Sequence, residues 1–517
     1  MRLGLGGKEM LTNRKTVKNK TSIALIKQTA LVLMTRRVPA LCLVLLLAVT
    51  HAKSAVANQL LELQPCDLSQ PNSAVVVKAE CGSLSVAENP RQPEGRRIDL
   101  HVAVLTARTD SPQSDPVMVL AGGPGQSAID MLASSSQLFR EIAKSRDLIF
   151  VDQRGTGRSN PLHCDYAESD ALSVSNAALA AMTERCLQVL TADPRFYTTA
   201  QAVDDLEQVR LALGVERVSL LGFSYGTRVA QEYLRRYEAS VRTMVVDGVL
   251  PPQHVLGLGF AENLERVVAL LIEECAADSG CAETFPNIRQ DYQKYLSLPP
   301  QAEVDATLRH PGTGRWENAA TSREVADAAV RLFSYAPETQ ALLPAIIHGV
   351  VAGDWRTVTA QALILSGRMQ SLLAMGMQNS VMCSEDIAYF SNDLAINDAQ
   401  MLGNMDDALR AVCSVWPIGE ANPDVHTPLQ SAVPALLLSG ELDPVTPPSF
   451  GAAALTQFEN GEHIVAQGVG HGVMLQPCFQ KLVADYIDLL QLPDPIPDCA
   501  AKDWRLPPYI SPAGPRL

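Results

Sequence analysis

The sequence of 517 residues lacks the marks of several protein classes. Basic residues are in deficit, with 42 Lys and Arg against 56 Asp and Glu and a formal net charge of −14. This balance argues against a nucleic-acid-binding protein, which needs cations to neutralise phosphates. No collagen period, heptad run or repeat of about 20 to 50 residues is found. With 47% hydrophobic and 19% charged residues, the composition excludes a disordered chain.

Motifs for metals and nucleotides are also missing. The sequence has no HExxH, no P-loop and no GxGxxG between a predicted strand and helix. No CxxC or His–Cys spacing indicates a zinc site. We therefore predict a protein with no metal and no cofactor.

The first 57 residues differ from the rest of the chain. They hold ten basic residues and one acid, and the apolar run at residues 38–49 is shorter than the roughly 20 residues that span a bilayer. Arg36 and Arg37 precede the run, and Ala55-Val56-Ala57 follows it, which is the pattern of a secretory signal. The alternative is an N-terminal membrane anchor. Met34 begins a compact signal by itself and is a possible true start.

This signal predicts an exported protein, periplasmic or extracellular, with no stable membrane span after its removal. Without residues 1–57 the chain would keep 32 basic and 55 acidic residues, a net charge of −23. The larger negative charge of the chain without residues 1–57 suggests attraction for basic peptides.

Cysteine usage agrees with export. Apart from Cys42 in the signal, ten cysteines remain, and sequential pairing is the simplest hypothesis because the loops are short. The alternative is buried free thiols. The expected pairs are Cys66–Cys81, Cys164–Cys186, Cys275–Cys281, Cys383–Cys413 and Cys478–Cys499.

Strand and helix patterns alternate in two parts of the chain. Residues 81–86 and 97–105 predict a β-hairpin, and short apolar strands at 116–121, 147–151, 217–221 and 242–246 are interspersed with helical patterns. Such alternation predicts a mostly parallel sheet covered by helices on both faces. Between about 250 and 434 the pattern is mainly helical, and strands return at 434–439 and 463–466. We predict an α/β sheet formed by residues 58–250 and 434–517, with a helical cap, residues 251–433, inserted after the sixth strand.

The segment Gly222-Phe223-Ser224-Tyr225-Gly226 lies between a predicted strand and a predicted helix. In this context G-x-S-x-G forms a sharp turn that exposes a nucleophilic serine, here Ser224. The loop Gly122-Gly123-Pro124-Gly125 follows an earlier strand, and Gly123 and Tyr225 would supply the two backbone N–H groups of an oxyanion hole.

The other two catalytic groups are expected later in the chain, in the order acid then histidine. Asp443 follows the strand at 434–439, and Glu441 is its nearby competitor. His471 lies between two glycines after the last strand, 28 residues beyond Asp443. Asp443 would orient the imidazole, and His471 would deprotonate Ser224 and later protonate the leaving group.

The chain resembles α/β-hydrolases of the prolyl aminopeptidase and secreted tripeptidyl aminopeptidase type. The resemblance rests on the motifs above, on Gly440-Glu441-Leu442-Asp443-Pro444 and on Asp152-Gln153-Arg154-Gly155-Thr156-Gly157-Arg158-Ser159, and its C-terminal part is similar to the tripeptidyl type. It implies the triad Ser224, Asp443 and His471, with Gly123 and Tyr225 as oxyanion donors. The family's usual His before the Gly-Gly-Pro-Gly loop is Ala121 here, and Tyr225 stands where prolyl aminopeptidases tend to have Trp.

An exopeptidase needs a carboxylate for the α-ammonium group of its substrate. Glu385 and Asp386, beside Cys383 in the cap, are our candidates, and a solvated acidic pair is the alternative. For Asp152 and Arg154 a structural role in locking their loop is favoured.

The sequence therefore predicts an exported serine hydrolase that releases residues from the amino end of short peptides through an acyl-enzyme. A carboxylic-ester hydrolase with the same triad is the first alternative. A catalytically inactive binding domain is the second.

Overall fold

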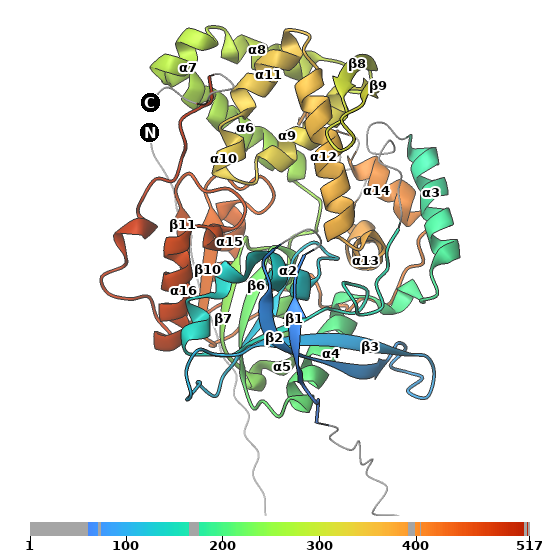
Figure 1. Ribbon diagram of the computed structural model, residues 1–517, viewed down its shortest axis with the longest axis vertical. Helices are drawn as coiled ribbons and strands as arrows, with labels where there is room; N and C mark the ends of the chain where they lie inside the picture. The colour runs from blue at the N-terminus through green and yellow to red at the C-terminus, as the bar shows by residue number, and fades with distance from the viewer. Residues whose placement is uncertain are drawn as a thin grey trace, which may run out of the picture. The chain divides into compact units, whose positions relative to one another are not determined.

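A nine-stranded sheet organises the part of the chain that can be described (Figure 1). The structure is a computed structural model that describes residues 60–70, 74–164, 175–390, 399–403, 405–510 and 514. These residues belong to one unit, 58–517. The predicted signal, residues 1–57, lies outside the described residues.

The strands of the sheet follow the order β1-β2-β3-β5-β4-β6-β7-β10-β11. β1, β2, β3 and β5 pair antiparallel, and every pair from β5 to β11 is parallel, as the alternation predicted. The strand bounds are β1 Gln64–Leu68, β2 Val77–Ala87, β3 Arg97–Leu105, β4 Val117–Leu120, β5 Leu148–Val151, β6 Val218–Phe223, β7 Val241–Asp247, β10 Ala435–Gly440 and β11 Gly461–Ala466.

Helices cover both faces of this sheet. Successive residues of a strand point to opposite faces, so Met118 of β4 packs with Val229 on one side, and Val119 packs with Leu132 and Phe479 on the other. All residues of β4, β5 and β10 are buried, as parallel strands between two helical layers require. The covering helices are α2 Ala128–Ser135 and α16 Pro477–Leu489 on one face, and α4 Thr199–Ala212 and α5 Tyr225–Tyr237 on the other.

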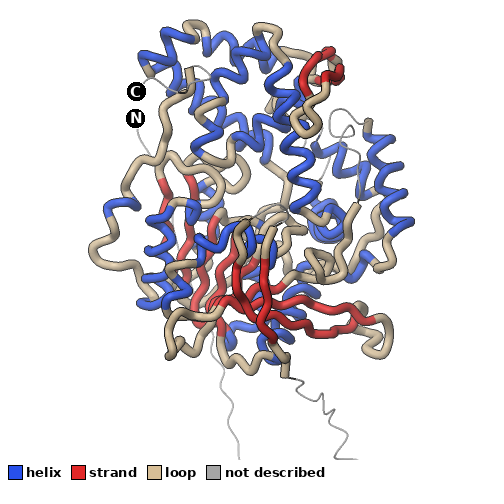
Figure 2. Tube along the Cα trace, viewed as in Figure 1, coloured by secondary structure: helices blue, strands red, loops and turns tan. Residues whose placement is uncertain are grey.

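The residues between β7 and β10 form a mainly helical cap (Figure 2). It has its own apolar core, in which Leu264, Tyr295 and Val330 are buried. Its helices are α6 Phe260–Ala277, α7 Ser279–Thr284, α8 Ile288–Ser297, α9 Arg323–Phe333, α10 Pro337–Gln340, α11 Leu343–Val351, α12 Arg356–Leu372, α13 Met375–Val381 and α14 Met405–Cys413. A π-helical turn, Met382–Asp386, follows α13. Two further helices lie outside this cap segment, α3 Asn176–Val189 and α15 Pro448–Leu455.

Two β features differ from the expectation. Among the described residues, the edge strand β1 makes β7 the seventh strand rather than the sixth, so the insertion follows the seventh described strand. The cap also contains a hairpin of β8 Val304–Arg309 and β9 Trp316–Thr321, where a mainly helical pattern was expected. Only Ala306 and Leu308 of β8 are buried, and so few apolar positions leave little alternation to detect.

Five disulfides join the ten cysteines in the sequential pairs. Cys164–Cys186 and Cys383–Cys413 lie in one small apolar cluster with Trp416. Within the part of the chain that is described, none of the helices has the length and apolar character needed to cross a bilayer.

Candidate active site

Ser224 occupies the turn between β6 and α5, at the carboxyl end of the strand. Its φ of 53° and ψ of −122° lie in a region that non-glycine residues rarely adopt, as in a strained nucleophile turn. The Ser224 N–H donates to the Asp247 carbonyl at 2.9 Å, and the Thr227 N–H donates to the Ser224 carbonyl at 2.9 Å. Ser224 therefore immediately precedes the positive end of α5.

The glycines of this motif lie where two chain segments cross. A Cβ on Gly222 would lie 2.5 Å from the Gly226 carbonyl oxygen, and a Cβ on Gly226 would collide with the Leu120 carbonyl oxygen. Any larger residue would force α5 away from β4 or open the turn. The sequence requirement of the motif is thus a matter of space.

The Gly-Gly-Pro-Gly loop lies beside Ser224, after β4. A Cβ on Gly122 would lie 3.1 Å from Ser224 Cβ. The cap holds the other end of the loop, because the Ala374 N–H donates to the Gly125 carbonyl at 2.9 Å. The predicted oxyanion residues, Gly123 and Tyr225, thus come from two segments that meet at Ser224.

Asp443 and His471 form a hydrogen-bonded pair in the loops after β10 and β11. His471 Nδ1 lies 2.7 Å from Asp443 Oδ2. Asp443 also accepts hydrogen bonds from Val445 N at 2.9 Å, Thr446 N at 2.8 Å and Thr446 Oγ1 at 2.6 Å. The carboxylate is fully buried, and its many donors leave it one orientation.

These contacts set the protonation of the pair. Burial opposes ionisation of Asp443, but the nearby His471 charge and the hydrogen bonds from His471 and Thr446 hold its pKa below the ordinary value. Burial likewise disfavours the His471 cation, and Asp443 outweighs it, so that the pKa of His471 is raised. The result is a histidine whose Nδ1–H faces a carboxylate, which leaves Nε2 to act as a base.

Asp247 and Gly248, at the end of β7, connect Ser224 to this pair. The Asp247 carbonyl accepts the Ser224 N–H, as described above. On the other side, a Cβ on Gly248 would lie 2.9 Å from His471 Cε1. The Asp247 carboxylate accepts from Val473 N and Met474 N, both at 2.8 Å, just beyond His471. Burial raises the pKa of Asp247 to about 6. Asp247 was not among the residues predicted from the sequence, although an acid at the end of an apolar strand was a signal for it.

Two cap residues hold the loops of the pair. Arg266 of α6 donates through Nη1 to the Glu441 carbonyl at 3.0 Å and through Nη2 to the Asp443 carbonyl at 2.9 Å. The backbone carbonyl of Tyr335, after α9, accepts the backbone N–H of His471 at 2.8 Å. The two rings meet edge to face with centroids 5.0 Å apart. No sequence motif marks either residue.

Glu385 and Asp386 lie in a buried network, with exposed fractions of 3% and 0%. Asp386 receives both terminal nitrogens of Arg228, at 2.9 and 3.0 Å. Glu385 accepts from Thr199 N at 2.6 Å and from Thr199 Oγ1 at 2.8 Å. Burial, together with the Asp386 charge, raises the pKa of Glu385 to about 7.

This burial rules out the alternative of a solvated acidic pair, and the network favours a structural role. Because Thr199 Oγ1 donates to Glu385, the Tyr225 hydroxyl 2.7 Å away donates to Thr199. Glu385 thereby supports the residue that follows Ser224. Binding of a substrate ammonium group by Glu385 or Asp386 stays a prediction.

Asp152 and Arg154 are engaged within the fold. Arg154 binds Asp205 with two nitrogens, at 2.6 and 2.8 Å. Asp152 accepts from Ser127 Oγ at 2.6 Å and from the N–H groups of Ile129 and Arg158. These contacts match the structural role expected for both residues.

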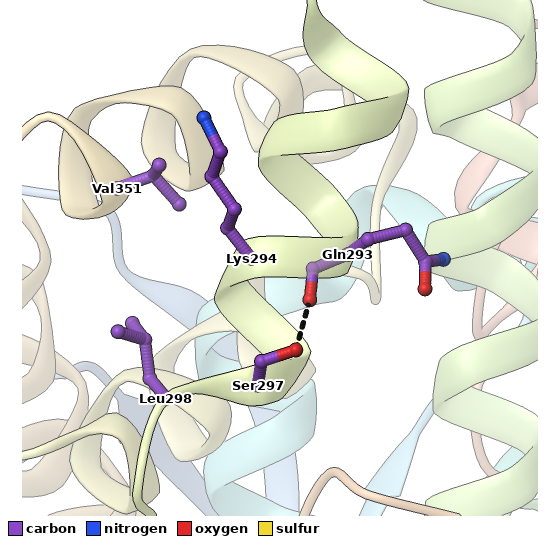
Figure 3. Close-up of a pocket in the computed structure, with 5 residues that line it drawn as sticks. All are labelled: Gln293, Lys294, Ser297, Leu298 and Val351. Atoms are coloured by element: carbon purple, nitrogen blue, oxygen red, sulfur yellow. Dashed lines mark hydrogen bonds between the residues drawn. The ribbon is translucent and has the colours of Figure 1, made fainter.

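A pocket of about 470 Å³ lies elsewhere, beside α8 and the end of α11 in the cap (Figure 3). It is lined by Gln293, Lys294, Ser297, Leu298 and Val351. The Ser297 hydroxyl is bonded to the Gln293 carbonyl at 2.7 Å within α8, and no acid or histidine joins the lining. Among the described residues no group of three or more His, Cys, Asp or Glu could hold a metal ion.

The sheet, the serine turn and the loops after β10 and β11 define an α/β hydrolase. A family model described as "alpha/beta hydrolase fold" matches residues 115–269, and one described as "TAP-like protein" matches residues 399–499.

Curated relatives agree with this class. Serine protease Hip1 of Mycobacterium tuberculosis is 24% identical over 484 residues, 83% of this chain and 89% of that protein. The tripeptidyl aminopeptidase of Streptomyces coelicolor is 25% identical over 448 residues, 79% of this chain and 80% of that protein. The YuaR protein of Escherichia coli is 30% identical over 424 residues, 76% of this chain and 82% of that protein. The chain belongs to the α/β-hydrolase family, with a C-terminal part of the TAP-like type.

Proposed function

We propose that this α/β hydrolase is an exported serine aminopeptidase that releases residues from the amino end of short peptides. The observation that supports the proposal most is the Asp443–His471 hydrogen bond, together with the contacts of Asp247 with Ser224 N and of Gly248 with the His471 ring. Relatives named serine protease and tripeptidyl aminopeptidase support the choice of peptide substrates. Export is proposed from the signal pattern of residues 1–57, and the five disulfides support it.

In this mechanism His471 Nε2 takes the proton of the Ser224 hydroxyl as Oγ attacks the scissile carbonyl. The N–H groups of Gly123 and Tyr225 stabilise the oxyanion of the tetrahedral intermediate. His471 then protonates the leaving amine, and water hydrolyses the acyl-enzyme by the same route. Asp443 stabilises the imidazolium at both stages.

A carboxylic-ester hydrolase is the second candidate. The burial of Glu385 and Asp386 favours it, because both carboxylates are already bound by residues of the protein and an exopeptidase needs one for the substrate amine.

The test is fluorophosphonate labelling followed by a substrate panel. Wild type should be labelled at Ser224, and Ser224→Ala should not. Aminoacyl and tripeptidyl anilides with free amines should be hydrolysed faster than their N-blocked forms and faster than acyl esters. Efficient cleavage of esters alone would select the second candidate, and absence of labelling at Ser224 would leave an inactive binding domain.

A further inference from the structure

Arg331 is a cation of the cap that lies near His471. It belongs to α9, one helical turn before Tyr335, whose ring packs on His471. The Arg331 charge is close enough to oppose protonation of His471 and so to lower its pKa, against the larger effect of Asp443. The guanidinium therefore lies beside the candidate active site.

The contacts of Arg331 are weak for a guanidinium. Its Nη2 is 3.4 Å from the Tyr335 hydroxyl, its Nη1 is 3.8 Å from Met405 Sδ, and its Cζ lies 5.1 Å from the centroid of the Phe260 ring. Its Nε is buried without a hydrogen-bond partner. Among the described residues no Asp or Glu forms an ion pair with it.

Three arginines that are almost fully buried in this fold are paired with carboxylates, whereas Arg331 is only partly buried. Arg154 binds Asp205, Arg228 binds Asp386, and Arg146 binds Asp115. A partly exposed guanidinium is open to a ligand, and its planar fork of N–H donors is suited to a carboxylate. Arg331 thus has donors in place for an anion that the described residues do not supply.

We propose that Arg331 binds a carboxylate of the substrate on the leaving-group side of the scissile bond. This inference rests on the proposed function, in which His471 protonates the leaving group, so the part of the substrate beside His471 is the part that departs. Two sources share this chemistry. One is the C-terminal carboxylate of a peptide that ends one residue after the scissile bond, and the other is an acidic side chain on that residue.

The experiment compares matched substrates that share one acyl part. In the first pair the leaving residue ends in a free acid or in an amide. In the second pair the leaving residue is Glu or Gln, both with C-terminal amides. Each pair is also made with an ester in place of the scissile amide, so that an esterase is tested equally.

In wild type the acid should exceed its neutral partner in kcat/KM by about 10- to 100-fold in one pair, the range typical of a hydrogen bond to a charged group. The pair that shows this preference identifies the source of the carboxylate. In Arg331→Met the ratio should fall to near one, and Arg331→Lys should keep part of it. Arg289→Met, which removes an exposed arginine paired with Glu273 on the cap, is the matched control and should keep the wild-type ratio.

A wild-type ratio near one in both pairs, or a ratio that Arg331→Met leaves unchanged, would overturn this inference while hydrolysis upholds the proposed function. No turnover of amides or esters, with no labelling of Ser224, would overturn the proposed function and this inference with it. Thermal melts of each variant show that the comparison is made on folded protein.

Discussion

Replacing Gly248 by alanine should impair catalysis far more than stability. Gly248 has φ +70°, and an added Cβ would lie 2.9 Å from His471 Cε1, 3.2 Å from His471 Nδ1 and 3.2 Å from Thr446 Oγ1. Real Cβ atoms do not approach ring atoms this closely, so the imidazole must move away from its bond to Asp443. A misplaced catalytic group can cost about 100-fold in rate even when the shift is near 1 Å.

The backbone strain of this substitution has its own cost, which a matched glycine isolates. Gly314, in the turn between β8 and β9, has φ +68°, and a Cβ there would meet nothing within 4 Å. Both variants should lose about 1–2 kcal/mol from the left-handed backbone alone. The difference between them therefore reports the displacement of His471.

The assay is kcat/KM on one peptide anilide, together with the melting temperature of each variant. We expect Gly314→Ala to keep near wild-type kcat/KM and Gly248→Ala to lose about 100-fold, with a modest fall in melting temperature for both. If Gly248→Ala stays within a few-fold of Gly314→Ala, the assignment of His471 to the reaction is refuted.

Further predictions follow from the same contacts. Asp443→Asn should lower kcat by about 10⁴-fold with the fold retained, because the amide no longer holds the Nδ1–H tautomer of His471. A small loss of kcat in steady-state assays would contradict this. The kcat/KM should rise with pH through the raised pKa of His471, since only the neutral imidazole accepts the Ser224 proton, and a pH–rate profile checks it. The raised pKa of His471 should contribute to the free energy of unfolding in full below the ordinary histidine pKa, and this contribution should be lost as pH rises through the pKa of the folded state. The lowered pKa of Asp443 should contribute above the ordinary aspartate pKa, and this contribution should be lost as pH falls through the pKa of the folded state. Urea titrations across pH measure both contributions. Arg266→Met should reduce kcat by releasing the Asp443 loop, whereas loss of stability alone would count against this positioning role. The intact mass of the denatured protein should rise on reduction by two hydrogens for each of the five disulfides. An intact mass that reduction leaves unchanged would show free thiols and contradict the pairing.

Part of this architecture follows from local pattern alone. Apolar strands such as β4 and β10 are buried on both faces, so their sequences are continuously hydrophobic and identify a parallel sheet. The serine turn is equally local, because Gly222, Ser224 and Gly226 meet within five residues between a strand and a helix. The positions of Asp443 and His471 could be predicted because each follows a recognisable strand.

Weak local signals explain the elements that were missed. β1 has five residues, of which only Leu68 is buried, and the hairpin β8–β9 buries few side chains. Such strands are stabilised by pairing with a neighbour rather than by their own pattern of polar and apolar residues.

By itself the sequence determined the hydrolase fold and the serine turn, since the strand patterns and the G-x-S-x-G motif depend on residues close together in the chain. The roles of Ser224, Asp443 and His471 stay predictions. Only the tertiary structure decided how charges are paired across the chain. Arg228 lies 158 residues before Asp386 and neutralises it, whereas Arg331 reaches the vicinity of His471 with no carboxylate partner among the described residues. The physical reason is that desolvation and ion pairing depend on distances in space, and the cap brings together groups that no spacing in the sequence connects.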